Sequence, residues 1–206
     1  MPRLTTWLND LLNHLEINQF YFLSHSWGSF VSLFYLAEYP ERVQSSILID
    51  GGYQTKRLKE QTMEEVAYHE KDFEEYVFDD WKGFFKSEKE AYTRWSPLIE
   101  MAVKDLGLEK NNKIYWHARG VTGGNIVKAM HKHETVDIYG NLPTNIILLR
   151  ATLPSSMDEY RDKTANIFEQ KTSGTVKRIP NTTHMLHWDN PGVVVEEIRK
   201  NWSQSY

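Results

Sequence analysis

Residues 21–30, Tyr-Phe-Leu-Ser-His-Ser-Trp-Gly-Ser-Phe, join the end of an apolar run to the start of a helical pattern. The apolar run at 19–23 predicts a short buried strand, and the residue spacing over 27–38 predicts a helix. A second apolar run at 43–49 predicts another strand, which ends at Asp50-Gly51-Gly52, where two glycines permit a sharp exit. Strand, helix and strand at this spacing form a parallel crossover, so the stretch indicates an α/β sheet.

The turn between the first strand and its helix has the pattern of a nucleophile turn. A tight strand-to-helix turn needs small residues two positions before and after its central residue, and Ser24 and Gly28 stand there around Ser26. Such a turn lifts the Ser26 hydroxyl out of the sheet and aims the N-terminus of the next helix at it. The backbone N–H of Trp27 would then donate to a developing oxyanion.

The two ends of the chain predict one sheet domain. Leucines and Trp7 at helical spacing predict an amphipathic helix over residues 3–15, with Thr5 or Thr6 as its cap. Further strands are predicted at 145–150 and 175–179, a helix at about 156–170, and a last helix that begins at Asn190-Pro191. We assign residues 1–52 and 141–206 to a core with about four strands.

Residues 53–140 predict an inserted helical lid, because charged residues are frequent there and aromatic residues recur at helical intervals. Two interpretations remain open for the aromatic residues: they form an apolar pocket for a substrate, or they form the lid's own core. They are Phe73, Tyr76, Trp81, Phe84, Phe85, Tyr92 and Trp95, with Val77 among them.

The composition is that of a globular protein, with 206 residues, 40% hydrophobic and 25% charged. A formal net charge of −4 gives no electrostatic reason to bind nucleic acid or an anionic membrane. The sequence has no cysteine, which excludes thiol catalysis, disulfides and thiolate metal sites. No apolar stretch has the length of a membrane span and no signal peptide is visible, so we expect a cytoplasmic protein.

Three segments together resemble the α/β-hydrolase family, in the group that carries an inserted lid. They are residues 24–29 (Ser-His-Ser-Trp-Gly-Ser), residues 39–52 with the second strand, and residues 181–191 (Asn-Thr-Thr-His-Met-Leu-His-Trp-Asp-Asn-Pro). The family more often has glycine where Ser24 stands, and serine is also small. The resemblance implies a partial α/β-hydrolase fold, with a parallel sheet flanked by helices and an inserted helical cap.

A serine nucleophile needs a general base within hydrogen-bond reach, and the sequence has eight histidines. The resemblance points to His184, in the polar loop between the last strand and the last helix. We expect His187 to pack or to line the entrance, and His25 to point away from the site. The pair His131 and His133 is expected at a solvated helix end, since no third metal ligand is evident.

The acid that orients His184 has two candidates. The family's usual aspartate would follow the strand ending near residue 150, but residues 151–154 (Ala-Thr-Leu-Pro) contain no acid. Asp158 is the first acid after it, and its sequence context reads as a capping box. Asp50 ends the preceding strand, a position from which some family members take their acid, and a buried carboxylate there needs a partner. We favour Asp50 and keep Asp158 as the alternative.

The family fold also has strands before the one at 19–23, with a loop that supplies a second oxyanion donor. The sequence therefore resembles the C-terminal part of a hydrolase: a truncated form, a start placed at an internal methionine, or a piece completed by another chain. The strand at 19–23 would have a bare apolar edge, which favours self-association. Loss of one oxyanion donor costs about 10²- to 10³-fold in rate, so we expect weak activity.

The resemblance implies a carboxylesterase-like serine hydrolase of small apolar or amphipathic substrates with ester, thioester, amide or carbon–carbon bonds. It would work through an acyl-enzyme and without a cofactor, with Ser26, His184 and Asp50 as the triad and Trp27 at the oxyanion. The alternative is a non-catalytic binding protein of the same fold. The absent acid after Arg150 and the absent N-terminal strands favour that alternative, whereas Ser26 and His184 favour the enzyme.

Overall fold

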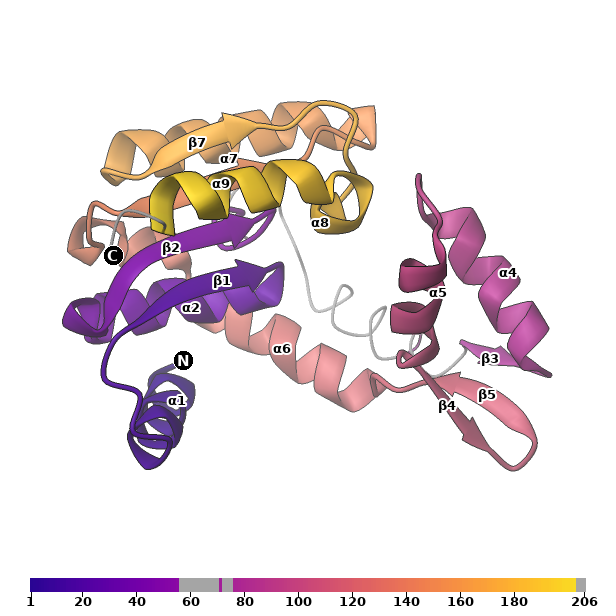
Figure 1. Ribbon diagram of the computed structural model, residues 1–206. Helices are drawn as coiled ribbons and strands as arrows, with labels where there is room; N and C mark the ends of the chain where they lie inside the picture. The colour runs from indigo at the N-terminus through magenta and orange to yellow at the C-terminus, as the bar shows by residue number, and fades with distance from the viewer. Residues whose placement is uncertain (56–70, 72–75, 203–206) are drawn as a thin grey trace. The chain divides into compact units, whose positions relative to one another are not determined.

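Four parallel strands form the sheet that carries the candidate site (Figure 1). They are β1 (Phe20–His25), β2 (Val43–Ile49), β6 (Ile146–Arg150) and β7 (Thr175–Arg178), in the spatial order β1-β2-β6-β7. All three neighbouring pairs run parallel, so the carboxyl ends of the strands meet at one edge of the sheet. The predicted parallel sheet flanked by helices is confirmed.

The computed structural model describes residues 1–55, 71 and 76–202. The chain divides into two compact units, residues 1–55 with 133–206, and residues 56–132. The first unit also contains α1 (Pro2–His14), α2 (Trp27–Glu38), η1 (Pro40–Arg42), η3 (Thr135–Asp137), η4 (Tyr139–Asn141), η5 (Ser155–Met157), α7 (Asp158–Lys171), α8 (Leu186–Asp189) and α9 (Pro191–Trp202).

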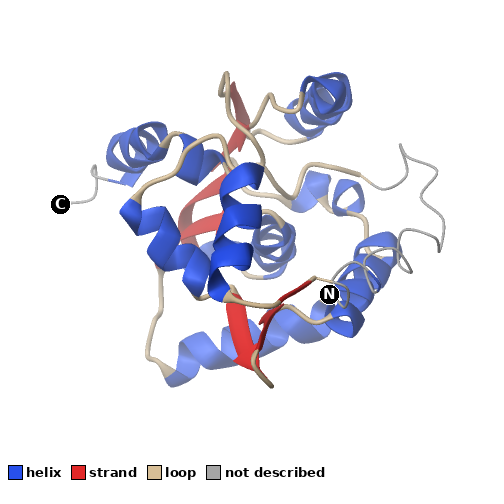
Figure 2. Cartoon of the chain, turned by 90° about the vertical axis from the view of Figure 1, so that its right-hand side faces the viewer, coloured by secondary structure: helices blue, strands red, loops and turns tan. Residues whose placement is uncertain are grey.

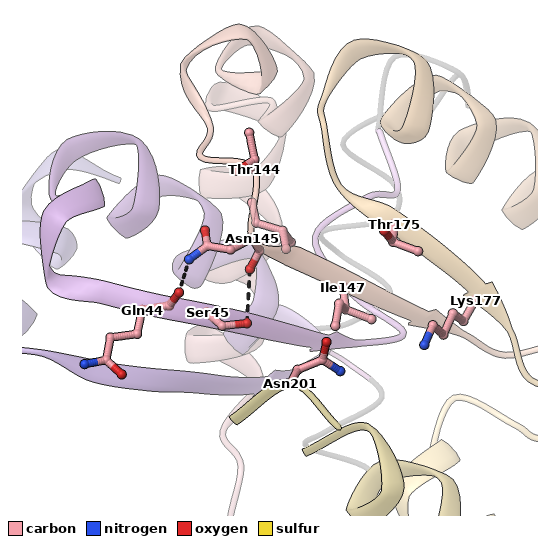
Figure 3. A pocket seen from close by; sticks show the side chains of 9 residues that line it. Gln44, Ser45, Thr144, Asn145, Ile147, Thr175, Lys177 and Asn201 are labelled. Atoms are coloured by element: carbon pink, nitrogen blue, oxygen red, sulfur yellow. Dashed lines mark hydrogen bonds between the residues drawn. The ribbon is translucent and has the colours of Figure 1, made fainter. Parts of the chain in front are cut away.

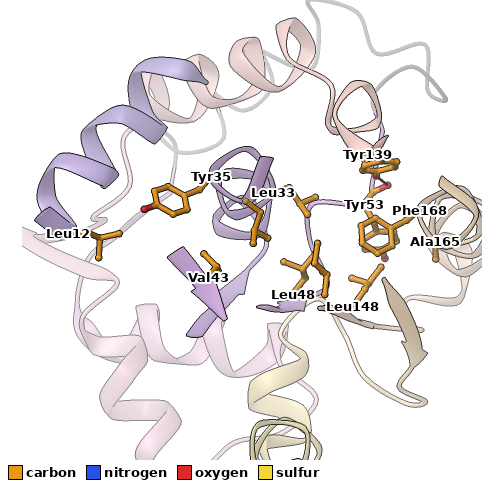
Figure 4. Packing of buried hydrophobic residues seen from close by; sticks show 12 residues of the cluster. Leu12, Leu33, Tyr35, Val43, Leu48, Tyr53, Tyr139, Leu148, Ala165 and Phe168 are labelled. Carbon is orange, nitrogen blue, oxygen red and sulfur yellow. Dashed lines mark hydrogen bonds between the residues drawn. The ribbon is translucent and has the colours of Figure 1, made fainter. Parts of the chain in front are cut away.

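Helices cover both faces of the sheet (Figure 2), so consecutive residues of its central strands, which point to opposite faces, are both buried. Leu48 of β2 and Leu148 of β6 pack with residues of α2 and α7, such as Leu33 and Phe168 (Figure 4). The neighbouring isoleucines and leucines of the same strands pack on the other face against α8 and α9. The continuous apolar runs seen in the sequence are therefore strands buried on both faces.

The first helix begins earlier than its sequence pattern predicts. Helix α1 begins at Pro2 with Met1 as its N-cap, so neither Thr5 nor Thr6 caps it. The Thr5 hydroxyl donates instead to the carbonyl of Pro2 and to the carboxylate of Glu38 on α2. Thr5 thus connects two helices, a role that residue spacing along one helix does not reveal.

The second unit contains a small sheet that the helical prediction missed. Its elements are β3 (Val77–Phe78), α4 (Trp81–Ala91), α5 (Pro97–Lys104), β4 (Gly107–Lys110), β5 (Lys113–Trp116) and α6 (Gly120–Lys132). The three strands are antiparallel in the order β3-β5-β4. Asn111 and Asn112 join β4 to β5 with φ of 53° and 58°, which is the left-handed turn that asparagine tolerates and that two-residue hairpins require.

Aromatic side chains pack around one buried ring in this second unit. Phe84 is fully buried and its ring contacts those of Phe78 and Trp81. The buried carboxylate of Glu88 accepts hydrogen bonds from Tyr76, Tyr92 and Trp116. The hydroxyls of the two tyrosines and the ring N–H of Trp116 thus have hydrogen-bond partners inside the unit. The predicted member Phe73 lies outside the described residues.

Candidate active site

The candidate site lies at the carboxyl edge of the parallel sheet. Ser26 follows β1 and Asp50 follows β2, while His184 lies in the loop after β7. Loops at this edge are where parallel α/β sheets bind their ligands. The topology therefore gathers three residues that are up to 158 positions apart in the sequence.

Ser26 has a strained backbone at the turn between β1 and α2. Its φ is 54° and its ψ is −123°, a region that non-glycine residues adopt at a cost of about 1–3 kcal/mol. Its N–H donates to the carbonyl of Ile49 on β2, and its own carbonyl accepts from Ser29 in the first turn of α2. Contacts on both sides of the turn thus hold the strained residue in place.

The tightest contact with this turn comes from Gly51. A Cβ at residue 51 would lie 2.2 Å from the carbonyl oxygen of Ser26, whereas a Cβ at Gly28 would lie 3.9 Å from the Cβ of Ser24. The Ser24 hydroxyl donates to the Ser29 hydroxyl at 3.1 Å, so a serine fits where the family more often has glycine. Sequence reasoning assigned the steric demand to Ser24 and Gly28, but the closest approach is made by the neighbouring strand end.

Ser26, His184 and Asp50 are joined by two hydrogen bonds. The His184 ring lies with Nε2 2.7 Å from Ser26 Oγ and with Nδ1 2.8 Å from Asp50 Oδ2. Because an ionised carboxylate only accepts hydrogen bonds, Nδ1 carries the ring proton and Nε2 is left as an acceptor for the serine hydroxyl. This arrangement can remove a proton from Ser26.

Asp50 is fully buried and its carboxylate has four neighbours that donate to it or carry positive charge. Oδ1 accepts from the hydroxyl of Tyr53 at 2.8 Å and from the N–H of Ala151 at 3.0 Å. Oδ2 lies 2.8 Å from His184 Nδ1 and 3.2 Å from Nη2 of Arg161. Burial by itself raises the pKa of Asp50, but the hydrogen bond from His184 and the charge of Arg161 together hold that pKa below its ordinary value.

The alternative acid, Asp158, is engaged elsewhere. Its carboxylate binds Arg150 and Arg178, each at 2.6 Å, at the start of α7. The capping-box interpretation of this residue is wrong, because the N-cap of α7 is Met157 and makes no side-chain cap. The hydrogen bond to His184 is made by Asp50.

The loop that carries His184 is fixed by threonines. The carbonyl of buried Thr182 accepts from the N–H groups of Thr152 and Leu153, and its hydroxyl donates to Ile179. The N–H and hydroxyl of Thr183 both donate to Asp189. Because the residues on the N-terminal side of His184 are held, its ring has a defined position.

His25 lies against His184, so the prediction that His25 points away is wrong. Nε2 of His25 lies 2.7 Å from the carbonyl oxygen of His184, and the two rings are 4.7 Å apart. The ring of His187 packs against the ring of His25, with 4.5 Å between their centres, as expected for a packing residue. Burial lowers the pKa of His25 and lowers the pKa of His187 to about 4. Both rings are therefore neutral near pH 7.

Trp27 is the first residue of α2. Because the first N–H groups of a helix have no carbonyl partner within it, the Trp27 N–H is free of intrahelical bonds. Its position directly after Ser26 suits a donor to an oxyanion formed there.

Other features of the described chain lie away from this arrangement. A polar pocket of about 340 Å³ is found at the opposite, amino ends of β2, β6 and β7 (Figure 3), lined by Gln44, Ser45, Thr144, Asn145, Ile146, Ile147, Thr175, Lys177 and Asn201. Within the described residues, no three His, Asp or Glu side chains gather in a way that could hold a metal ion. Over the same residues no helix has the length and apolarity needed to cross a membrane.

Comparisons with known proteins identify the class. The family model described as the alpha/beta hydrolase fold matches residues 2–191, so the chain belongs to this family. No curated protein matches its sequence.

Solved structures of the same fold are similar over nearly the whole chain. An E-2-(acetamidomethylene)succinate hydrolase shares 15% identity with a TM-score of 0.71, covering 97% of this chain and 72% of its own. An esterase of M. tuberculosis shares 16% identity with a TM-score of 0.74, covering 97% and 68%. A probable hydrolytic enzyme of Pseudomonas aeruginosa PAO1 shares 14% with a TM-score of 0.68, covering 97% and 68%. At these identities the likeness shows the fold.

Proposed function

We propose that the protein is a serine hydrolase with Ser26 as nucleophile, His184 as general base and Asp50 as the acid that orients His184. The observation that carries the proposal is the pair of hydrogen bonds, 2.7 Å from His184 to Ser26 and 2.8 Å from His184 to Asp50. Solved structures of similar fold include hydrolases and esterases, which agrees with this class.

In the proposed reaction, Ser26 Oγ attacks the carbonyl carbon of the substrate while its proton passes to Nε2 of His184. The oxyanion that forms is stabilised by the N–H of Trp27, and Asp50 stabilises the protonated imidazole. When the tetrahedral intermediate collapses, His184 gives the proton to the leaving group and an acyl-enzyme remains. Water then attacks the acyl-enzyme by the same steps and releases Ser26.

The substrates we propose are small esters, thioesters, amides or carbon–carbon bonded compounds, of which carboxylic esters are the simplest to test. We expect slow turnover, because Trp27 is the one oxyanion donor that we assign, and loss of a second donor costs about 10²- to 10³-fold in other hydrolases.

A fluorophosphonate probe tests the proposal, because it reacts with serines that have an active general base. We expect wild-type protein to be labelled at Ser26 after prolonged incubation, as read by mass spectrometry, and Ser26→Ala to remain unlabelled. Ser24→Ala is the matched control, since it changes a buried hydroxyl on the same turn and should retain labelling. Folded wild-type protein that takes up no probe would instead support a non-catalytic binding protein.

A further inference from the structure

Arg161 of α7 contacts Asp50 of the proposed triad and is almost fully buried, at 4% exposure. Its Nη1 donates to the carbonyl of Leu153 at 2.6 Å, and its Nη2 lies 3.2 Å from Oδ2 of Asp50. Leu153 belongs to the segment where the family's usual acid would stand. In this protein the backbone of that segment binds Asp50 and its neighbour Arg161. The N–H of Ala151 donates to Asp50, and the carbonyl of Leu153 accepts from Arg161.

A buried carboxylate beside a neutral imidazole has an electrostatic problem. Before reaction His184 must be neutral to accept the serine proton, so it offers Asp50 a hydrogen bond but no charge. An ionised carboxylate buried without a counter-charge is costly, and such a pair tends to retain a proton instead. A retained proton on His184 would block its use as a base.

The other groups around this pair supply no permanent positive charge. Tyr53 faces Asp50 as a neutral donor, since burial and the nearby Asp50 raise the pKa of its phenol. His25 and His187 are neutral near pH 7, because burial lowers the pKa of each, and Asp189, which accepts from Thr183, is not a cation. Among the ion pairs of the described residues, Arg161 is the permanent cation that reaches Asp50.

We propose that Arg161 is a positioning residue that keeps Asp50 ionised while His184 is neutral, and so makes His184 available as a base near neutral pH. The inference rests on the proposed function for its catalytic meaning. Removing the guanidinium charge leaves the negative charge of Asp50 uncompensated, so the Asp50–His184 pair binds its proton more strongly. The acid limb of the pH–rate profile must then move to higher pH.

The first test compares pH profiles of kcat/KM for wild type and Arg161→Gln, which removes the charge and keeps a polar side chain with N–H groups. We expect the acid limb of Arg161→Gln to move up by about one pH unit or more, which is a loss of about tenfold below the limb, with a much smaller change on the alkaline plateau. Arg161→Lys keeps the charge and should retain the wild-type limb. A uniform loss at all pH values for Arg161→Gln would overturn the proposal.

Arg150→Gln is the matched control. Arg150 is also almost fully buried and binds two carboxylates of α7, Asp158 and Asp162, each at 2.6 Å, but not Asp50. Its loss should leave the acid limb in place. Equal movement of the limb in Arg150→Gln and Arg161→Gln would contradict a specific role for Arg161.

A stability cycle covers the case in which Arg161→Gln fails to fold. If Arg161 serves as the counter-charge of Asp50, then adding Asp50→Asn should restore folding, as read by circular dichroism and the free energy of unfolding. Failure of the double variant to recover any stability would overturn the proposal.

An NMR titration of the His184 ring separates this inference from the proposed function. In a Ser26→Ala background, which needs no turnover, adding Arg161→Gln should move the ring's titration midpoint to higher pH by about one unit or more. A shifted midpoint in a protein that never labels with fluorophosphonate would retain the electrostatic role and reject the hydrolase. An unshifted midpoint in a protein that does label would retain the hydrolase and reject the electrostatic role of Arg161.

Discussion

Ser26 and Asp50 both have positive φ, at 54° and 41°, although neither is glycine. Strained backbone of this kind persists where surrounding contacts fix it, and it concentrates at functional sites. Here the fixing contacts are reciprocal, because the Ser26 N–H donates to Ile49, the last residue of the strand before Asp50, and Gly51 lies against the Ser26 carbonyl. The two strand ends therefore position each other.

Substitution of Asp50 tests the choice of acid. We expect Asp50→Asn to lower kcat on a p-nitrophenyl ester by about 10⁴-fold, because the amide favours the wrong His184 tautomer and does not stabilise its charged form. Asp158→Asn should leave kcat little changed but lower the free energy of unfolding by about 1–3 kcal/mol, since Arg150 and Arg178 each lose a partner. The assignment fails if Asp158→Asn alone abolishes turnover.

Substitution of Gly51 tests the steric basis of the turn. We expect Gly51→Ala to displace the Ser26 backbone, because the new Cβ would meet its carbonyl oxygen at 2.2 Å. Fluorophosphonate labelling should be lost, and thermal unfolding should show a destabilisation of about 1–3 kcal/mol. Gly28→Ala, whose Cβ makes an ordinary 3.9 Å contact, should unfold close to the wild-type temperature. Equal destabilisation by both variants would show that Gly51 has no special role.

At the scale of elements, the sequence predicted helices and strands best where the spacing of apolar residues and the residues typical of helix ends indicate the same element. The predicted bounds 27–38 and 43–49 are those of α2 and β2, and Asn190 does accept from Val193 at the start of α9. Prediction failed in the second unit, where strands of two to four residues are too short to display a period of two. The Asn111-Asn112 pair was the available signal for the hairpin.

Helix α8 should make the protein sensitive to acid through His187. Its pKa lies at about 4 in the folded protein, against an ordinary 6.5, because the neutral ring is buried. The unfolded chain therefore binds the extra proton first, and stability falls as pH drops from 6.5 towards 4. We expect His187→Phe to flatten the dependence of the unfolding free energy on pH over this window, as measured by urea denaturation.

The exposed His14 on α1 provides the control for this experiment. His14→Phe should retain the wild-type slope of stability against pH, because its ring is not packed in the core. A wild-type slope in His187→Phe would show that other groups cause the acid sensitivity.

At the scale of the whole molecule, β1 is the edge strand of the sheet. Its one strand partner among the described residues is β2, and Leu23 on it is 42% exposed. Unpaired strand edges with exposed apolar side chains favour pairing with another chain, whereas an edge lysine opposes it. This feature underlies the expectation of self-association.

We therefore expect wild-type protein to show concentration-dependent association in analytical ultracentrifugation, and Leu23→Lys to shift it towards monomer. Leu98→Lys on α5 is the control, because Leu98 is more exposed, at 76%, but lies on a helix in the second unit. A monomer at all concentrations, or equal effects of both lysines, would reject association through the β1 edge.

The sequence by itself predicted the parallel α/β core and the turn at Ser26. Its resemblance to the α/β-hydrolase family added His184 and two candidate acids, Asp50 and Asp158. The core and the turn follow from local patterns, since a strand buried on both faces and a small-residue turn are visible in a few consecutive residues. Only the tertiary structure decided that Gly51 contacts Ser26, that His25 contacts His184, and that Arg161 reaches Asp50. Each of these contacts joins residues from separate segments of the chain, and their distances depend on how the sheet and its helices pack, which no local pattern encodes.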